Sequence, residues 1–337
     1  MMVLDTDHSE RLWAIAFHPD GKHLLGGNNG VIRRWRLIDG KEVGKQTGVE
    51  LRAISVSRDH KWIVCGTYNG ASVWDGEMHK KVIDVEGTNL VWAVDVSPES
   101  TRFATGTGGG HDNASIWSIT TGKRLVGPLK HDNWIAGVRF SPDGQHFATA
   151  CVGKSIRIFN SHNGDNLVTI KTDIPSRVPP PLAWSSDGEQ IFATSEDKKI
   201  RTFNTSTGSQ LAESQMLHDG DNGVSSITPA TSGNFIATYA ERSIWFLDTL
   251  TLALIGPAIE DGGRIQSIAI SADSSHLATG RGDGKIVIRD LGKILPDLNG
   301  PINVSICALI LLASRIPSPS LTNYSGVYSR RSTTRYG

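Results

Sequence analysis

The chain has 337 residues, enough for one large domain or two domains of ordinary size. Lysine and arginine total 34, as do aspartate and glutamate, so no net charge draws the chain to nucleic acid or to an anionic membrane. The 36 glycines indicate many tight turns, which favours short strands over long helices.

Neither a signal peptide nor a membrane-spanning helix is expected from the sequence. Cys65, Cys151 and Cys307 are too widely spaced for a disulfide framework or a zinc site, which favours a reducing compartment. The N-terminal stretch MMVLDTDHSE is acidic and lacks the apolar core of a signal peptide, and no run of about 18 apolar residues predicts a spanning helix. We therefore expect a cytoplasmic protein, with a nuclear location left open.

One phrase recurs along the chain. VRFSPDGQHFATA, at 138–150, has relatives such as IAFHPDGKHLLGG, VDVSPESTRFATG and IAISADSSHLATG. Each unit reads as an apolar strand, a turn of the Ser-Pro-Asp-Gly type, and three more short strands separated by turns. No helical period persists for about ten residues, so almost no helix is expected. The units are 39 to 45 residues apart and start at Ile15, Ile54, Val94, Val138, Leu182, Ile227 and Ile268.

This pattern resembles the WD40 repeat family over about residues 1–295, although the signature dipeptide is intact only at Trp74-Asp75. The resemblance implies an all-β fold, a seven-bladed WD40-type β-propeller with four-stranded blades around a central channel. The phrase GPLKHDNWIAGVRFSPDG, at 127–144, is also similar to the WD40 arrays that follow NACHT-type NTPase domains in fungal proteins.

The two ends of the repeat array predict how the ring closes. The seventh unit supplies a third strand at IVIRDL, 286–291, but no convincing fourth strand follows it. Met2-Val3-Leu4 occupies the place that an outer strand takes before every other unit. We expect this N-terminal strand to complete the last blade, which would remove an exposed sheet edge.

Residues 296–337 form a non-repeat tail that we expect to be disordered or poorly packed. From about Asn303 the sequence resembles nothing before it, and its apolar run is too short to span a bilayer. Val304-Ser305 can be encoded as a splice-donor consensus and Tyr324-Ser325 as an acceptor. An alternative interpretation is therefore that the tail is an unspliced reading and not part of the folded protein.

The stretch Ala148–Ser155 matches a relaxed phosphate-loop pattern ending in Gly-Lys-Ser. That chemistry needs a helix after the loop, and here the strand IRIF follows. We interpret the stretch as a hairpin and expect no nucleotide cofactor.

His131-Asp132 and His218-Asp219 could suggest metal ligands, but both pairs lie just before a unit, as does His8. The resemblance implies that such a histidine joins a hydrogen-bonded network inside its blade. We expect no metal site, because the repeat supplies no convergent partners.

In the predicted propeller, the top face carries the loops that lead into the innermost strands and those that join second to third strands. The residue two before each unit start opens this face: Trp13, Arg52, Trp92, Ala136, Pro180, Ser225 and Gln266. Trp13, Arg52 and Trp92 come from consecutive blades and are of the types that anchor interfaces, so we expect one contiguous patch. The alternative is that the two tryptophans only cap their own blades. The adjoining loops add three candidates: Trp134, Arg11 and Arg264.

The leading hypothesis is a non-catalytic scaffold, monomeric by itself, that binds an unidentified protein or peptide on the top face. One alternative is a hydrolase or other enzyme with its site at the mouth of the central channel. Such a site needs converging Asp, Glu or His side chains, and the seven opening positions contain none, so we predict no catalytic residues. Another alternative is the sensor array of an NTPase-linked receptor.

Overall fold

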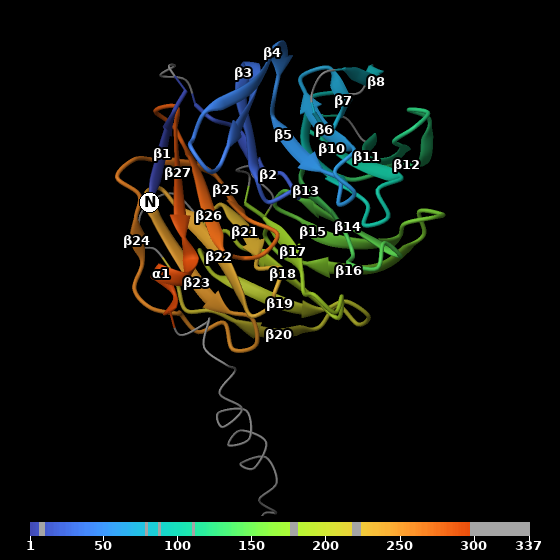
Figure 1. The fold of residues 1–337 in the computed structure, drawn as a ribbon. Coiled ribbons are helices and arrows are strands. Elements are labelled where there is room, and N and C mark those ends of the chain that lie inside the picture. The colour runs from blue at the N-terminus through green and yellow to red at the C-terminus, as the bar shows by residue number, and fades with distance from the viewer. Residues whose placement is uncertain are drawn as a thin grey trace, which may run out of the picture. The chain divides into compact units, whose positions relative to one another are not determined.

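The computed structural model describes residues 1–6, 11–77, 80–86, 89–109, 112–175, 181–217 and 224–296. Within them the strands form seven antiparallel sheets, the blades of a β-propeller (Figure 1). The predicted all-β fold is confirmed, and the single helix in these ranges is α1 (Leu291–Ile294). None of the described helices is long and apolar enough to cross a bilayer.

The innermost strands surround the channel, and each contacts the innermost strands of the two neighbouring blades. They are β2 (Ala14–Phe17), β5 (Ala53–Val56), β9 (Val91–Val96), β13 (Ile135–Phe140), β17 (Leu182–Trp184), β21 (Ser226–Pro229) and β25 (Ile265–Ile270). The second strands are β3 (His23–Arg36), β6 (Trp62–Thr67), β10 (Arg102–Thr107), β14 (His146–Cys151), β18 (Gln190–Thr194), β22 (Phe235–Ala240) and β26 (His276–Arg281).

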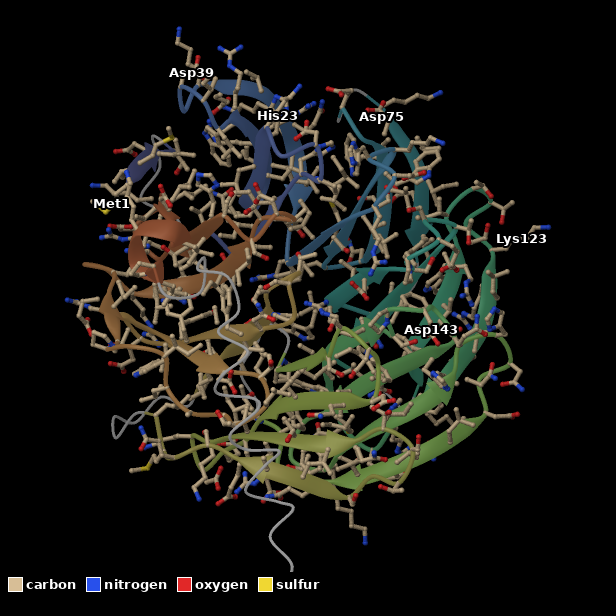
Figure 2. All side chains as sticks on the ribbon, turned by 60° about the horizontal axis from the view of Figure 1, so that its bottom comes forward. Met1, His23, Asp39, Asp75, Lys123 and Asp143 are labelled. Carbon is tan, nitrogen blue, oxygen red and sulfur yellow. The ribbon has the colours of Figure 1, made fainter. Side chains whose placement is uncertain are left out.

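The remaining strands lead outward to the margin of the ring. The third strands are β7 (Gly70–Asp75), β11 (Asp112–Ser118), β15 (Ser155–Asn160), β19 (Ile200–Asn204), β23 (Ser243–Asp248) and β27 (Lys285–Asp290). The outer strands are β1 (Met2–Asp5), β4 (Glu42–Glu50), β8 (Lys81–Glu86), β12 (Arg124–Lys130), β16 (Asn166–Lys171), β20 (Gln210–Glu213) and β24 (Ile259–Glu260). The turns that carry Asp39 and Lys123, between third and outer strands, lie at this margin (Figure 2).

The first blade departs from the four-strand prediction. β3 is continuous through the second and third positions, so this sheet is assigned as β2-β3-β4. Its residues Leu24–Gly27 pair with β2, and Asn29–Trp35 pair with β4. The change of direction near Gly30, which has a φ of 120°, is tight enough that the strand is not interrupted.

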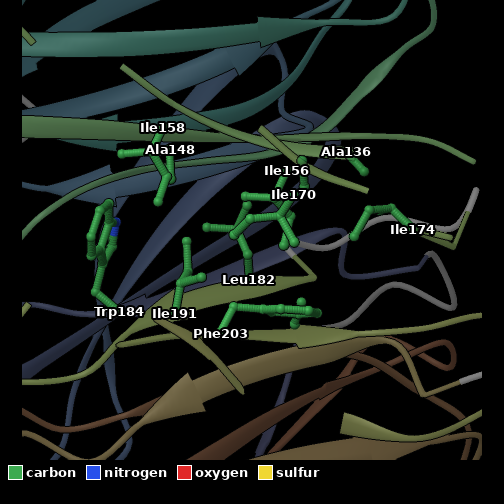
Figure 3. Packing of buried hydrophobic residues seen from close by; sticks show 12 residues of the cluster. Ala136, Ala148, Ile156, Ile158, Ile170, Ile174, Leu182, Trp184, Ile191 and Phe203 are labelled. Atoms are coloured by element: carbon green, nitrogen blue, oxygen red, sulfur yellow. The ribbon is translucent and has the colours of Figure 1, made fainter. Parts of the chain in front are cut away.

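The core lies between blades, since each sheet is covered on both faces by its neighbours. In the cluster shown in Figure 3, Ala148 and Ile158 of one blade lie near Leu182 and Ile191 of the next, and Phe203 adds its ring. All five side chains are buried. This double covering explains why the strands are rich in Val, Ile, Ala and Phe rather than strictly alternating with polar residues.

The predicted ring closure is confirmed. β1 pairs antiparallel with β27 and gives the last sheet the order β1-β27-β26-β25, with Met2 opposite Ile288 and Leu4 opposite Ile286. Thr6 extends the contact, because its Oγ1 donates a hydrogen bond to the Gly284 carbonyl oxygen at 2.7 Å.

The predicted hairpin at the phosphate-loop pattern is also confirmed. Gly153 and Lys154 form the turn between β14 and β15, and Cys151 pairs with Ser155 across it. A strand therefore starts at the residue where a phosphate loop would begin its helix. Residues 297–337 of the predicted tail lie outside the described residues, as do His8 and His218.

Two blades retain polar contacts of the predicted hydrogen-bonded network. In the third, the Trp117 Nε1 donates to Thr105 Oγ1 at 2.9 Å. In the fourth, His131 Nδ1 donates to the Leu129 carbonyl oxygen at 3.0 Å, and its Nε2 lies 2.8 Å from Thr149 Oγ1. These contacts fasten one strand of a blade to another.

The last blade fills the equivalent positions with a buried ion pair. Arg289 stands where the third strands of the third and fourth blades carry Trp117 and Phe159, and it is hydrogen-bonded and ion-paired to Asp261. Thr279 Oγ1 lies 3.0 Å from both Arg289 Nη1 and Asp261 Oδ1. Both charges are therefore compensated inside the blade.

Candidate functional site

Arg52 is the centre of a cluster on the top face. It follows β4, precedes β5, and its backbone N–H donates to the Gly66 carbonyl oxygen at 2.8 Å. Its guanidinium carbon Cζ lies over the rings of Trp13 and Tyr68, 4.3 Å from each centroid, and 5.6 Å from the Trp92 ring centroid. Arg52 thus joins aromatic side chains from the first three blades, and it is only 8% exposed.

Trp92 continues the cluster toward the fourth blade. Its ring stacks on that of Trp134, with centroids 6.4 Å apart and planes 20° apart. Gly108 makes room for it, because a Cβ at that position would lie 2.0 Å from the Trp92 Nε1. Trp134 is 47% exposed and forms the open end of the cluster.

The two remaining candidates differ in position. Arg11 is exposed, and its Cζ lies 6.0 Å from the Trp13 ring centroid, so it belongs to the same cluster. Arg264 is exposed on the loop before β25, and the described contacts do not join it to the others. The name rim cluster is used below for Arg11, Trp13, Arg52, Tyr68, Trp92 and Trp134.

A small cavity of about 90 Å³ lies in the channel against the rim cluster. Trp13, Arg52 and Trp92 line it together with small residues of the innermost strands, among them Ala14 and Ser267. Because the lining comes from the first four and the last two blades, the cavity belongs to the channel and not to the space between two sheets.

Arg139 on β13 also lines the cavity, and its Nη1 lies 3.6 Å from an Asp95 carboxylate oxygen on β9. Burial raises the pKa of Asp95, and the Arg139 charge opposes that rise. Asp95 also accepts a 2.8 Å hydrogen bond from the Phe140 backbone N–H, so it fastens β9 to β13.

Three polar atoms of this region have no hydrogen-bond partner among the described residues. They are Arg52 Nε, Trp92 Nε1 and Ser267 Oγ, all buried, and all three can donate. The residues that line the cavity include no carboxylate and no imidazole. The described residues also contain no group of three or more His, Cys, Asp or Glu side chains placed to hold a metal ion. The groups described in this region are therefore hydrogen-bond donors and aromatic rings.

A larger and more open groove, of about 690 Å³, lies between the first two blades on their outer side. Its wall includes Lys81 and Asp84, whose side chains are hydrogen-bonded to each other at 2.5 Å. The charged side chains on its wall are exposed, unlike the buried Arg52, so size alone does not make it the stronger candidate.

Sequence reasoning missed three residues here. Tyr68 lies in the turn between β6 and β7, where the repeat gives no constant residue type. Gly108 lies in a glycine-rich stretch of the sequence, and its role depends on the ring of Trp92, sixteen positions earlier. Arg139 could have been found from register, because it follows Val138, the start of its unit, and points a cation into the channel. Pro180, another predicted opening position, lies outside the described residues.

The profile of the WD domain, G-beta repeat family (WD40) matches residues 2–36, 123–160 and 253–290. Each matched segment starts in or just before the outer strand of one blade and ends in the third strand of the next. The matches therefore follow the structural repeat, including the N-terminal strand that closes the ring.

Three known proteins of similar sequence have different names. The small ribosomal subunit protein RACK1 of Caenorhabditis elegans is 31% identical over 44% of this chain and 48% of its own length, so the match spans about half of that relative. The eukaryotic translation initiation factor 3 subunit I of Aspergillus terreus is 26% identical over 83% of this chain and 74% of its own length. The guanine nucleotide-binding protein subunit beta of Arabidopsis thaliana is 27% identical over 82% of this chain and 68% of its own length. WD40 repeats are thus matched at three positions of the chain, and its seven sheets form a seven-bladed β-propeller.

Proposed function

We propose that this chain is a non-catalytic protein-interaction scaffold that binds a peptide or a domain at the rim cluster. The observation that carries the proposal is the position of the Arg52 guanidinium, which lies over the Trp13 and Tyr68 rings and close to Trp92. Interface hot spots are enriched in Trp, Tyr and Arg, and they lie in well-packed, desolvated surroundings.

The names of the relatives support the same class. A small ribosomal subunit protein, a subunit of an initiation factor and a subunit of a guanine nucleotide-binding protein are all parts of larger assemblies. Two of these names belong to translation, which supports a cytoplasmic location as a proposal. The enzyme alternative gains no support from the channel, because its cavity is lined without carboxylate or imidazole groups. The NTPase-linked receptor remains a prediction from the sequence alone.

Affinity purification from cell extract tests the proposal. Proteins retained by the wild-type chain should be lost with a Trp13→Ala/Trp92→Ala variant, since truncating two hot-spot residues weakens binding by about 2 kcal/mol or more each. The matched control is Leu167→Ala/Leu211→Ala, which shortens two half-exposed residues on outer strands. Thermal unfolding of each variant would show that the propeller remains folded.

Retention of the same proteins by all three chains would contradict the proposal. If the wild-type chain, the tryptophan variant and the outer-strand control all retain the same proteins, the rim cluster is not the binding surface.

A further inference from the structure

Arg52 carries a buried charge without an ion-pair partner among the described residues. Its exposed fraction is 8%, and the contacts of its guanidinium are with aromatic rings. Burial lowers its pKa, and the charge of Glu50 opposes that effect. A cation removed from water and left without a counter-charge is unfavourable, and a bound anion would compensate it.

The aromatic contacts restrict where such an anion can bind. The Trp13 and Tyr68 ring centroids each lie 4.3 Å from the guanidinium carbon, so aromatic faces cover that part of the group. An anion must therefore be held by hydrogen bonds from the N–H groups. A guanidinium edge matches the two oxygens of a carboxylate, with two parallel hydrogen bonds.

The surroundings of Arg52 favour an acceptor as well. Its own Nε is buried and has no hydrogen-bond partner among the described residues, and Arg52 lines the cavity. Nε can only donate, and the described residues that line the cavity include no carboxylate to accept from it. The cavity of about 90 Å³ is small, which suits one carboxylate group better than a larger ligand.

We propose that the rim cluster recognises the carboxylate of an aspartate or glutamate side chain, presented by a protein segment at the mouth of the channel. This inference rests on the proposed function and gives the partner its chemistry. Arg139, the other cation that lines the cavity, is ion-paired with Asp95, so Arg52 is the cavity-lining cation left to match one negative charge, whereas a phosphate dianion carries two. The carboxylate is therefore the anion to which the site is suited.

The test begins with peptide display. Random linear peptides are selected on the wild-type chain and counter-selected on the Trp13→Ala/Trp92→Ala variant, so that the retained peptides bind the rim cluster. We expect an acidic residue to be enriched at one position. Replacing it by its amide, Glu→Gln or Asp→Asn, should weaken binding to the wild-type chain by about 10- to 100-fold, the range for a hydrogen bond to a charged group.

A double-mutant cycle then assigns the effect to Arg52. Arg52→Gln should weaken binding of the acidic peptide by a similar factor and should leave binding of the amide peptide almost unchanged. The affinity of Arg52→Lys for the acidic peptide should lie between those of the wild-type chain and Arg52→Gln. Lysine keeps the positive charge but cannot form the two parallel hydrogen bonds of a guanidinium. The matched control is Arg124→Gln, since Arg124 also lies over a tryptophan, 4.8 Å from the Trp117 ring centroid, but on the outer strand β12.

The outcomes separate the inference from the proposed function. If selected peptides need both tryptophans but bind equally well as acid and amide, carboxylate recognition is overturned while the binding surface stands. If phosphoserine at the acidic position binds more tightly than glutamate or aspartate, the site is a phosphate site and the inference is wrong. If no peptide distinguishes the wild-type chain from the tryptophan variant, both proposals fail. The acid-to-amide comparison uses only the wild-type chain, so a poorly folded variant does not obscure it.

Discussion

His131 shows how burial of one side chain makes stability depend on pH. The residue is 2% exposed, and its ring is held by the Leu129 carbonyl oxygen and the Thr149 hydroxyl. Burial lowers its pKa to about 4, and the nearby Arg157 charge acts in the same direction. The neutral form, which can donate from Nδ1 and accept at Nε2, is the form that fits the blade.

The sign of the pH effect follows from this lowered pKa. Between about pH 6.5 and pH 4 the unfolded chain binds a proton at His131 and the folded chain does not, so the free energy of unfolding falls as the pH falls. The maximum loss is about 3 kcal/mol. His131→Gln removes the titrating group, so the stability advantage of the wild-type chain over this variant should shrink by that amount across the window. Urea unfolding at a series of pH values measures it, and a difference that does not vary with pH would contradict the assignment.

Single residues also show what the sequence could predict about the site. Trp13, Arg52 and Trp92 occupy one register position in consecutive blades, which suggested a contiguous patch but left open that the tryptophans only cap their own blades. The positions of both rings beside the Arg52 guanidinium show that the three side chains meet. Arg264 is at a comparable loop, but its position relative to the cluster depends on side-chain direction, which the repeat does not specify. The space that Gly108 leaves for Trp92 depends on packing between a hairpin and a strand, and no local pattern carries it.

At the scale of elements, strand positions follow from the repeat because turn residues and apolar runs recur at one phase. The repeat could not predict which contacts form at positions that keep their place in the repeat but carry a different residue type. Arg289 and Asp261 are an example: separately they read as departures from the pattern, and only the fold shows that they replace one polar contact by another. The continuity of β3 through two strand positions likewise depends on the geometry of one turn.

The closing strand β1 gives the prediction that belongs to this scale. Deleting Met1–Asp5 removes the four strand pairs to β27 and the buried side chain of Leu4, so unfolding should become easier by more than about 3 kcal/mol. The exposed edge of β27 should also make the protein associate at higher concentration. Calorimetry and light scattering would measure the two effects.

A point variant is the control for this deletion. Val3→Thr changes a half-exposed side chain of β1 and keeps the backbone pairing, so it should behave like the wild-type chain. If the shortened protein has an unchanged melting temperature and stays monomeric, β1 does not stabilise the ring.

At the scale of the whole molecule, stability rests on apolar contact between neighbouring blades. Leu182 is fully buried in the cluster between the fourth and fifth blades, whereas Leu167 on the outer strand β16 is 50% exposed. Leu182→Ala should therefore cost about 2–5 kcal/mol, and Leu167→Ala should stay within about 0.5 kcal/mol. Chemical denaturation compares the same substitution at two depths. Equal effects would mean that contact between blades is not what holds the ring.

The pairing of β1 with β27 also has a consequence for synthesis. The chain leaves the ribosome in the direction from N- to C-terminus, so β1 is made well before its partner, Lys285–Asp290. At roughly 5–20 residues per second, the first strand waits about 15–60 s for the strand that will cover it. During that interval the earlier blades can pack on one another, but the ring cannot close because β27 has not been made. The nascent propeller is therefore an open arc of blades until β27 emerges, and only then can β1 pair and close the ring.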